Sequence, residues 1–161
     1  MDDITTLGVK LGYAVETTEG QKPENFTWLP RCKSIGGVSL ETEQIDVSAL
    51  EDLISKYKKG RQDTGGTWEV VFGLGDKVLA AIKKMMTDSA AAEKTGKATW
   101  FEVWFPDLST ENSGFFIIAQ PGGNIPSPSV EGNSAAEVTM VFTLNDYKGV
   151  DAGIEPTASG V

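Results

Sequence analysis

The sequence predicts a mainly β protein: a β-sandwich or barrel of six to seven strands with one flanking α-helix. Short segments in which apolar and polar residues alternate are separated by turns rich in glycine and proline, a pattern typical of half-buried strands. One segment has the three- and four-residue spacing of an amphipathic helix. The 161 residues, 40% of them hydrophobic, fit a single domain with one core, and we find no internal repeat.

Seven segments show the strand pattern. In chain order they cover residues 9–18, 26–29, 33–45, 67–74, 98–105, 115–118 and 136–144. The pattern is clearest in the fourth segment, where Trp68, Val70 and Phe72 fill one face. Adjacent glycines at Gly36 and Gly37 predict a bulge or sharp bend within the third segment.

The fifth segment has apolar side chains on both faces. Trp100 and Trp104 share one face, and Phe101 and Val103 share the other. We therefore expect this strand to be covered on both sides. The sixth segment is its expected hairpin partner, and a mobile loop over about 120–134 then leads to the last strand.

The predicted helix covers roughly residues 77–93. Asp76 is a good N-cap residue, and Gly96 is a plausible stop. One face of this segment carries an apolar stripe made by Val78, Leu79, Ile82, Met85 and Met86.

Two further segments lack a regular pattern, a long loop over about 46–66 and a flexible C-terminal arm over about 148–161. A connection as long as the first is uncommon without a function. It contains apolar residues that a single copy would struggle to bury, namely Leu50, Leu53, Ile54 and Tyr57. Basic residues surround that tyrosine: Lys56, Lys58, Lys59 and Arg61. In an acidic protein, such a patch favours pairing with acids on a neighbouring copy over binding nucleic acid.

Composition excludes several classes of function. The formal net charge of -9 argues against a surface built to bind nucleic-acid phosphates. The chain has no histidine and one cysteine, which rules out histidine-containing triads, imidazole zinc sites and an intrachain disulfide. We expect no enzyme activity, no cofactor and no metal. With no apolar run long enough to span a bilayer and no secretion signal, we also expect the chain to stay in a cytoplasm.

The remaining motifs favour structural interpretations. The run Gly73-Leu74-Gly75-Asp76 follows a strand and opens a helix, but the dinucleotide-binding fingerprint needs a third glycine that is absent. The acids Glu41, Glu43 and Asp46 lack the spacing of a calcium loop and indicate a solvated face. Cys32 has no activating group in the sequence and is expected to be a small buried residue.

Several runs resemble phage tail tube proteins, in particular the major tail proteins of long-tailed phages and prophages of Gram-positive bacteria. Residues 35–52 resemble that family's opening, in which a bent strand leads into an Asp46-Val47-Ser48-Ala49-Leu50 turn and a long loop. Residues 101–107, 114–116 and 136–144 are similar to its later strands. The resemblance covers most of the chain in order and length.

The resemblance implies a structural role. Six copies would form a ring, and rings would stack into a tube around an acidic lumen through which DNA passes without specific binding. The implied partners are other copies of the chain, a tape measure protein, a tail terminator and distal tail or baseplate proteins. The implied location is the virion tail, assembled in the host cytoplasm, with no membrane partner.

Two sets of site residues follow. We expect ring-to-ring contacts at Leu50, Leu53, Ile54, Tyr57 and Lys59. We expect Glu41, Glu43, Glu69 and Glu137 to lie on or near the lumen. Four alternatives stay open: another tail or head-completion ring protein, an Hcp-like secretion tube, a ligand-binding β-barrel, and an enzyme that uses carboxylates.

Overall fold

The structure of the protein is a computed structural model. It describes residues 5–39, 41–49, 53–54, 56–63, 66–128, 130–132 and 134–158, and for residues 41–43 and 60–63 it describes the backbone alone. The strands are β1 (Lys10–Val15), β2 (Thr27–Leu29), β3 (Cys32–Ile35), β4 (Glu41–Asp46), β5 (Tyr57–Asp63), β6 (Thr67–Gly73), β7 (Thr99–Trp104), β8 (Gly114–Pro121) and β9 (Glu137–Asp151). One α-helix, α1 (Asp76–Lys94), and one short 3-10 helix, η1 (Thr110–Asn112), complete the described elements.

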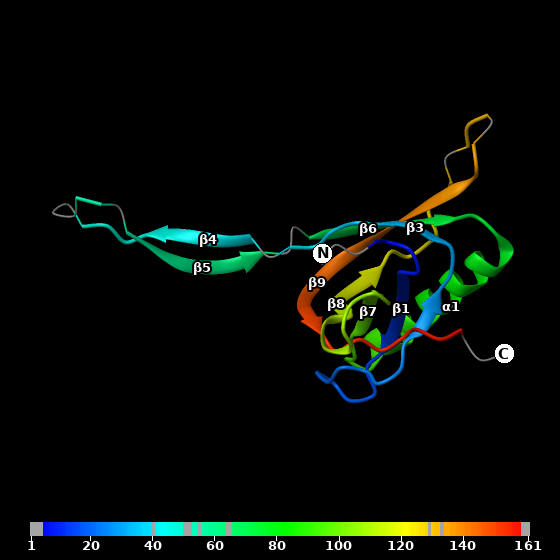
Figure 1. Cartoon of the computed structure of the whole chain (residues 1–161), viewed down its shortest axis with the longest axis horizontal. Helices are drawn as coiled ribbons and strands as arrows, with labels where there is room; N and C mark the ends of the chain where they lie inside the picture. Colours follow the sequence, from blue (N-terminus) through cyan, green and yellow to red (C-terminus); the bar gives the residue numbers. More distant parts are fainter. Residues whose placement is uncertain are drawn as a thin grey trace.

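Seven strands form one antiparallel sheet in the order β2-β1-β7-β8-β9-β6-β3 (Figure 1). Strands β2 and β3 lie at opposite edges of this sheet, although only Pro30 and Arg31 separate them in the chain. The sheet must therefore curl until its two edges approach each other. Arg31 makes the turn with φ 62, and its carbonyl accepts a hydrogen bond from the Gly73 N–H at 2.8 Å. The predicted fold class, mainly β with one helix, is confirmed.

The concave face of the sheet encloses the main core. Trp68, Phe101 and Phe142 meet at its centre, with ring centroids 4.9 to 5.4 Å apart. The apolar stripe of α1 packs onto this core through Val78, Ile82 and Met85, as the spacing predicted. The buried aromatic and aliphatic side chains on both elements explain why the helix lies against the sheet.

The sequence predicted where α1 stops, but it predicted the wrong N-cap residue. The N-cap residue is Gly75 and not Asp76, which is already helical, and no side chain caps this end. At the other end, Gly96 adopts φ 73, and the N–H groups of Gly96 and Lys97 donate to the carbonyls of Glu93 and Ala92. This is a Schellman motif, so the predicted stop at Gly96 is confirmed.

A second, smaller core covers the opposite face of β1, β7 and β8. It consists of Ala14, Phe26, Trp100 and Phe116, with Ile154 packed against it. Strand β7 is consequently buried on both faces, as predicted. The C-terminal arm, predicted to be loose from residue 148, instead continues β9 to Asp151 and then packs over this core.

The third predicted strand is divided in two. Strand β3 ends just before the glycine pair, residues 36–39 have no regular structure, and β4 begins at Glu41. Gly36 is needed there, because a Cβ atom would lie 2.9 Å from the Glu69 carbonyl oxygen. Residues 57–63, predicted to be loop, form β5 and pair with β4 as a separate two-stranded sheet.

A bulge in β9 provides a test of backbone strain. Gly149 has φ 84, and no atom lies within 4 Å of the position that its Cβ would take. Gly149→Ala will therefore lower the free energy of unfolding by about 1 kcal/mol through strain alone. Urea denaturation measures the change, and Gly122→Ala is the matched control, because Gly122 has equal space without the positive φ. Equal effects of the two substitutions would contradict this explanation.

Candidate assembly surfaces

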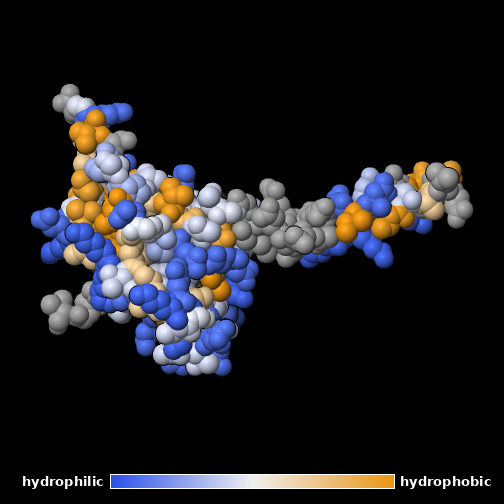
Figure 2. Space-filling view, turned by 180° about the vertical axis from the view of Figure 1, so that it is seen from behind, coloured by the Kyte–Doolittle hydropathy of each residue, from blue (hydrophilic) through white to orange (hydrophobic). Residues whose placement is uncertain are grey.

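The β4–β5 hairpin projects away from the curled sheet (Figure 1). Its described apolar side chains are largely exposed: Ile45 49%, Val47 42%, Leu53 102%, Ile54 78% and Tyr57 57%. Figure 2 shows the resulting hydrophobic surface on the projection, far from the body. Side chains of this kind are normally buried, so their concentration on one projection makes it the candidate interaction surface of the described residues.

Strand register divides the hairpin into two faces. Ile45 lies opposite Lys58, and Asp46 lies opposite Tyr57. Since directly paired residues share a face and neighbours along a strand alternate, Ile45, Val47 and Lys58 lie on one face. Tyr57 lies on the other face, together with Asp46. One face is therefore apolar and basic, and the other combines an aromatic ring with a carboxylate.

Polar contacts shape the end of the hairpin where the strands leave their ladder. The Asp46 carboxylate accepts a hydrogen bond from the Ser48 N–H at 2.9 Å, and bonds from Ser48 lower the pKa of Asp46. The Ser48 hydroxyl in turn accepts a hydrogen bond from the Lys56 N–H at 2.6 Å. Asp46, predicted as part of a solvated acidic cluster, therefore organises the turn.

The base of the hairpin is held by β6. The indole N–H of Trp68 donates to the Gly36 carbonyl at 2.8 Å, and the Gly36 N–H donates to the Glu69 carbonyl at 2.8 Å. Because Trp68 is itself a central core residue, these bonds connect the start of the projection to the rigid part of the sheet. The core thus fixes the chain at Gly36, a few residues before β4 begins.

The predicted contact residues come together on this hairpin. Leu53, Ile54, Tyr57 and Lys59 all belong to it and are exposed, while Leu50 lies outside the described residues. The sequence analysis did not select Ile45 and Val47. Their alternation with Gln44, Asp46 and Ser48 is the available signal, but the predicted boundary between the strand over 33–45 and the loop over 46–66 divides it.

The predicted lumen residues are described in part. Glu69 and Glu137 both lie on the exposed face of the β6–β9 pair, because Glu69 is opposite Val141 and side chains alternate along β9. Lys33 pairs with Glu137 at 3.2 Å, with both side chains partly exposed. The side chains of Glu41 and Glu43 lie outside the described part of the chain.

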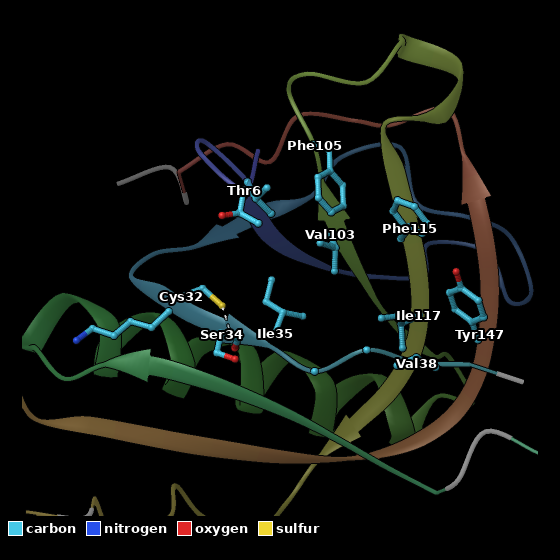
Figure 3. A pocket seen from close by; sticks show the side chains of 14 residues that line it. Thr6, Cys32, Ser34, Ile35, Val38, Val103, Phe105, Phe115, Ile117 and Tyr147 are labelled. Atoms are coloured by element: carbon cyan, nitrogen blue, oxygen red, sulfur yellow. Dashed lines mark hydrogen bonds between the residues drawn. The ribbon is translucent and has the colours of Figure 1, made fainter. Parts of the chain in front are cut away.

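A groove opens at the mouth of the curled sheet, between β3 on one side and β7 and β8 on the other (Figure 3). Its volume is about 580 Å³, and Ile35, Val103, Phe115 and Ile117 point into it. Cys32 lies at its edge and is half-buried. Burial raises the pKa of the Cys32 thiol to about 12, so the reactive thiolate is scarce at neutral pH.

Within the described ranges, no group of three or more histidine, cysteine, aspartate or glutamate residues is arranged to hold a metal ion. In the same part of the chain, α1 and η1 are too short or too polar to cross a membrane.

Comparison with known proteins gives no match to a protein family and no match to a curated protein sequence. Solved structures do match. One is a protein chain in the tail of an empty GTA particle with C6 symmetry. The TM-score is 0.52 and the identity 13%, and the match covers 88% of this chain and 94% of that chain. Another is the six-fold symmetrised baseplate of the anti-feeding prophage, with a TM-score of 0.51 and 10% identity over 91% and 94% of the two chains.

The chain shares its fold with these two proteins of phage-like tail particles. This confirms the sequence resemblance at the level of fold, across nearly the whole length of the chain. The narrower assignment to long-tailed phages and prophages of Gram-positive bacteria stays a prediction. In this fold, the exposed hairpin and the exposed face of β6 and β9 are the two described surfaces whose exposure needs an explanation.

Proposed function

We propose that this chain is the structural subunit of a phage-type tail tube, in which hexameric rings stack around a DNA-conducting lumen. The observation that carries the proposal is the β4–β5 hairpin with its exposed apolar side chains. An isolated two-stranded hairpin is only marginally stable in water. A neighbouring copy that covered it would stabilise the hairpin and bury the hydrophobic surface in the same step.

The six-fold symmetry of both similar assemblies supports a hexameric ring for this chain. A closed ring uses one head-to-tail interface repeated around the axis. A second contact is then needed between rings. The hairpin suits that second role, because it extends well beyond the body and carries Leu53 and Ile54 at full or nearly full exposure.

Charge supports a lumen that conducts DNA. The net charge of -9 makes the protein as a whole repel nucleic acid. We place Glu69 and Glu137 on the lumen side, since their shared face of β6 and β9 is largely exposed and otherwise carries Thr67, Val71, Thr139, Val141 and Thr143. A density map of the tube with these two carboxylates on its outer wall would overturn this placement.

The remaining parts of the proposal follow from this role. Other copies of the chain, a tape measure protein, a tail terminator and distal tail or baseplate proteins would be its partners. DNA would pass without specific binding, no cofactor would be required, and no reaction would be catalysed. The site would be the virion tail, assembled in the host cytoplasm.

The similarity to a baseplate protein favours a second candidate, a single ring at the end of a tail. Electron microscopy of the concentrated protein, with sizing of the dilute protein, separates the two. Hollow tubes of many rings support the tube subunit, and isolated six-fold rings support the baseplate ring. A chain that remains monomeric at high concentration, even with preformed tail tips added as initiators, would contradict both.

A further inference from the structure

The chain after β9 forms a strap across the smaller core. We define the C-terminal strap as residues 152–157. The Gly153 N–H donates to the Thr110 carbonyl and to the Ser113 hydroxyl, each at 3.1 Å. Thr157 then bridges to the outer edge of β2: its carbonyl accepts from the Trp28 N–H at 2.7 Å, and its N–H donates to the Phe26 carbonyl at 3.1 Å. The strap is thus bonded to the body at both ends.

A buried carboxylate lies beneath the middle of the strap. Glu102 of β7 has no exposed surface, and its Oε2 accepts a hydrogen bond from the Ile154 N–H at 2.7 Å. Its Oε1 has no hydrogen-bond partner among the described residues. Gly114 of β8 and Gly12 of β1 leave room for this arrangement. A Cβ atom on Gly114 would lie 2.7 Å from Glu102 Oε2, and a Cβ atom on Gly12 would lie 2.8 Å from the Pro156 ring of the strap. Removal of the strap would therefore open a path for water to Glu102.

The second buried carboxylate among the described residues behaves differently. Glu16 is 4% exposed, but both its oxygens accept hydrogen bonds, from the Ala98 N–H and the Trp100 indole N–H, each at 2.8 Å. Burial raises the pKa of Glu16, but these bonds outweigh it, so the pKa lies below its usual value. A fully bonded carboxylate is stable as the anion, whereas Glu102 has one oxygen in an apolar site without a donor.

We propose that Glu102 is a proton-controlled latch: the strap is held over the sheet while Glu102 is protonated and loosens when Glu102 ionises. Burial raises the pKa of Glu102 from 4.5 to about 7, and the bond from Ile154 and the charge of Lys22 offset part of that effect. Once the strap lifts, water reaches the carboxyl group and its pKa returns toward 4.5. Between these two values the closed strap binds a proton that the open strap does not, so closure weakens as pH rises through this window and levels off above it.

Few other charges surround the latch. Lys22, from the loop before β2, forms an ion pair with Asp151 at 3.2 Å. Lys10 of β1 forms an ion pair with Glu155 of the strap at 3.0 Å. The facing strand β8 has no charged residue, and Glu102 is the only charged residue of β7. A hydrogen bond from the Ala152 N–H and the neighbouring Lys22 lower the pKa of Asp151, whereas burial raises that of Glu102, which leaves Glu102 as the carboxyl group beneath the strap that favours a proton.

Hydrogen exchange of the dilute full-length chain, read by mass spectrometry, tests the latch. After correction for the intrinsic pH dependence of exchange, protection of the strap amides should fall about thirtyfold between pH 5.5 and 7.5, since each unit within the window changes the equilibrium about tenfold. Amides of the main core, such as those of β6, should keep their protection. Strap protection that changes less than threefold, or a core that loses protection in parallel, overturns the proposal.

Two variants identify the proton site. Glu102→Gln retains a carbonyl that can accept from Ile154 and cannot ionise, so strap protection should become independent of pH. The matched control Glu16→Gln changes the other buried carboxylate and should leave the response of the strap intact. A response that persists in Glu102→Gln overturns the latch, and the wild-type profile decides the question alone if that variant fails to fold.

Discussion

Replacing both Leu53 and Ile54 with aspartate will prevent assembly while leaving the monomer folded. The two side chains are 102% and 78% exposed, so the monomer loses no packing. In a ring-to-ring contact, each would contribute about 1.5–3 kcal/mol through burial, and each aspartate would add a desolvation penalty. We expect the concentration needed for assembly to rise at least about a hundredfold.

Sedimentation and negative-stain microscopy over a concentration series measure this effect. The matched control is Leu7→Asp, which places the same charge on a leucine that is 83% exposed but lies outside the hairpin. That variant should assemble like the unchanged protein. If the double variant formed tubes at the usual concentration, the hairpin would not be the ring-to-ring contact.

Phe142→Ala will cause the largest loss of stability among the single substitutions considered. Phe142 is fully buried, and its ring centroid lies 4.9 Å from that of Phe101 and 5.1 Å from that of Trp68. Removing the ring loses its burial and leaves a cavity between three strands, at a cost of about 3–5 kcal/mol. That loss is a large share of the 5–15 kcal/mol typical of a whole domain.

The free energy of unfolding from urea denaturation measures this loss. Phe105→Ala is the matched control, because Phe105 also packs against an aromatic ring, that of Phe115 at 5.5 Å, but lies half-buried at the groove. It should cost less than half as much. Equal losses at the two positions would mean that the cluster of Trp68, Phe101 and Phe142 is not the centre of stability.

Elements that face the core could be predicted from the sequence, because burial leaves a period in the residue pattern. Segment 67–74 predicted β6 (Thr67–Gly73) to within one residue, and segment 77–93 did the same for α1. Strand β5 was missed because its run Tyr57-Lys58-Lys59-Gly60-Arg61 has no apolar alternation. A strand that projects from the body does not pack on the core, and so its sequence does not need alternating apolar residues.

The burial of Glu102 could not be predicted from the sequence either. In the sequence it shares a face with Trp100 and Trp104 and has no sign of being the most deeply buried acid. The backbone N–H that donates to its carboxylate belongs to Ile154, 52 residues away in the chain. The sequence likewise predicted residues 46–66 only as a loop whose apolar side chains need a partner. The pairing of β4 with β5 depends on strand register and not on burial, so no periodic pattern predicts it.

The position of β9 has a consequence for synthesis. This strand lies between β8 and β6, and so it joins β2, β1, β7 and β8 to the pair β6 and β3. A nascent chain that stops before β9 lacks the strand that hydrogen-bonds to both groups, which are then connected through Pro30 and Arg31 and not through a continuous sheet. The ribosome must therefore synthesise β9 before the seven-stranded sheet can be complete.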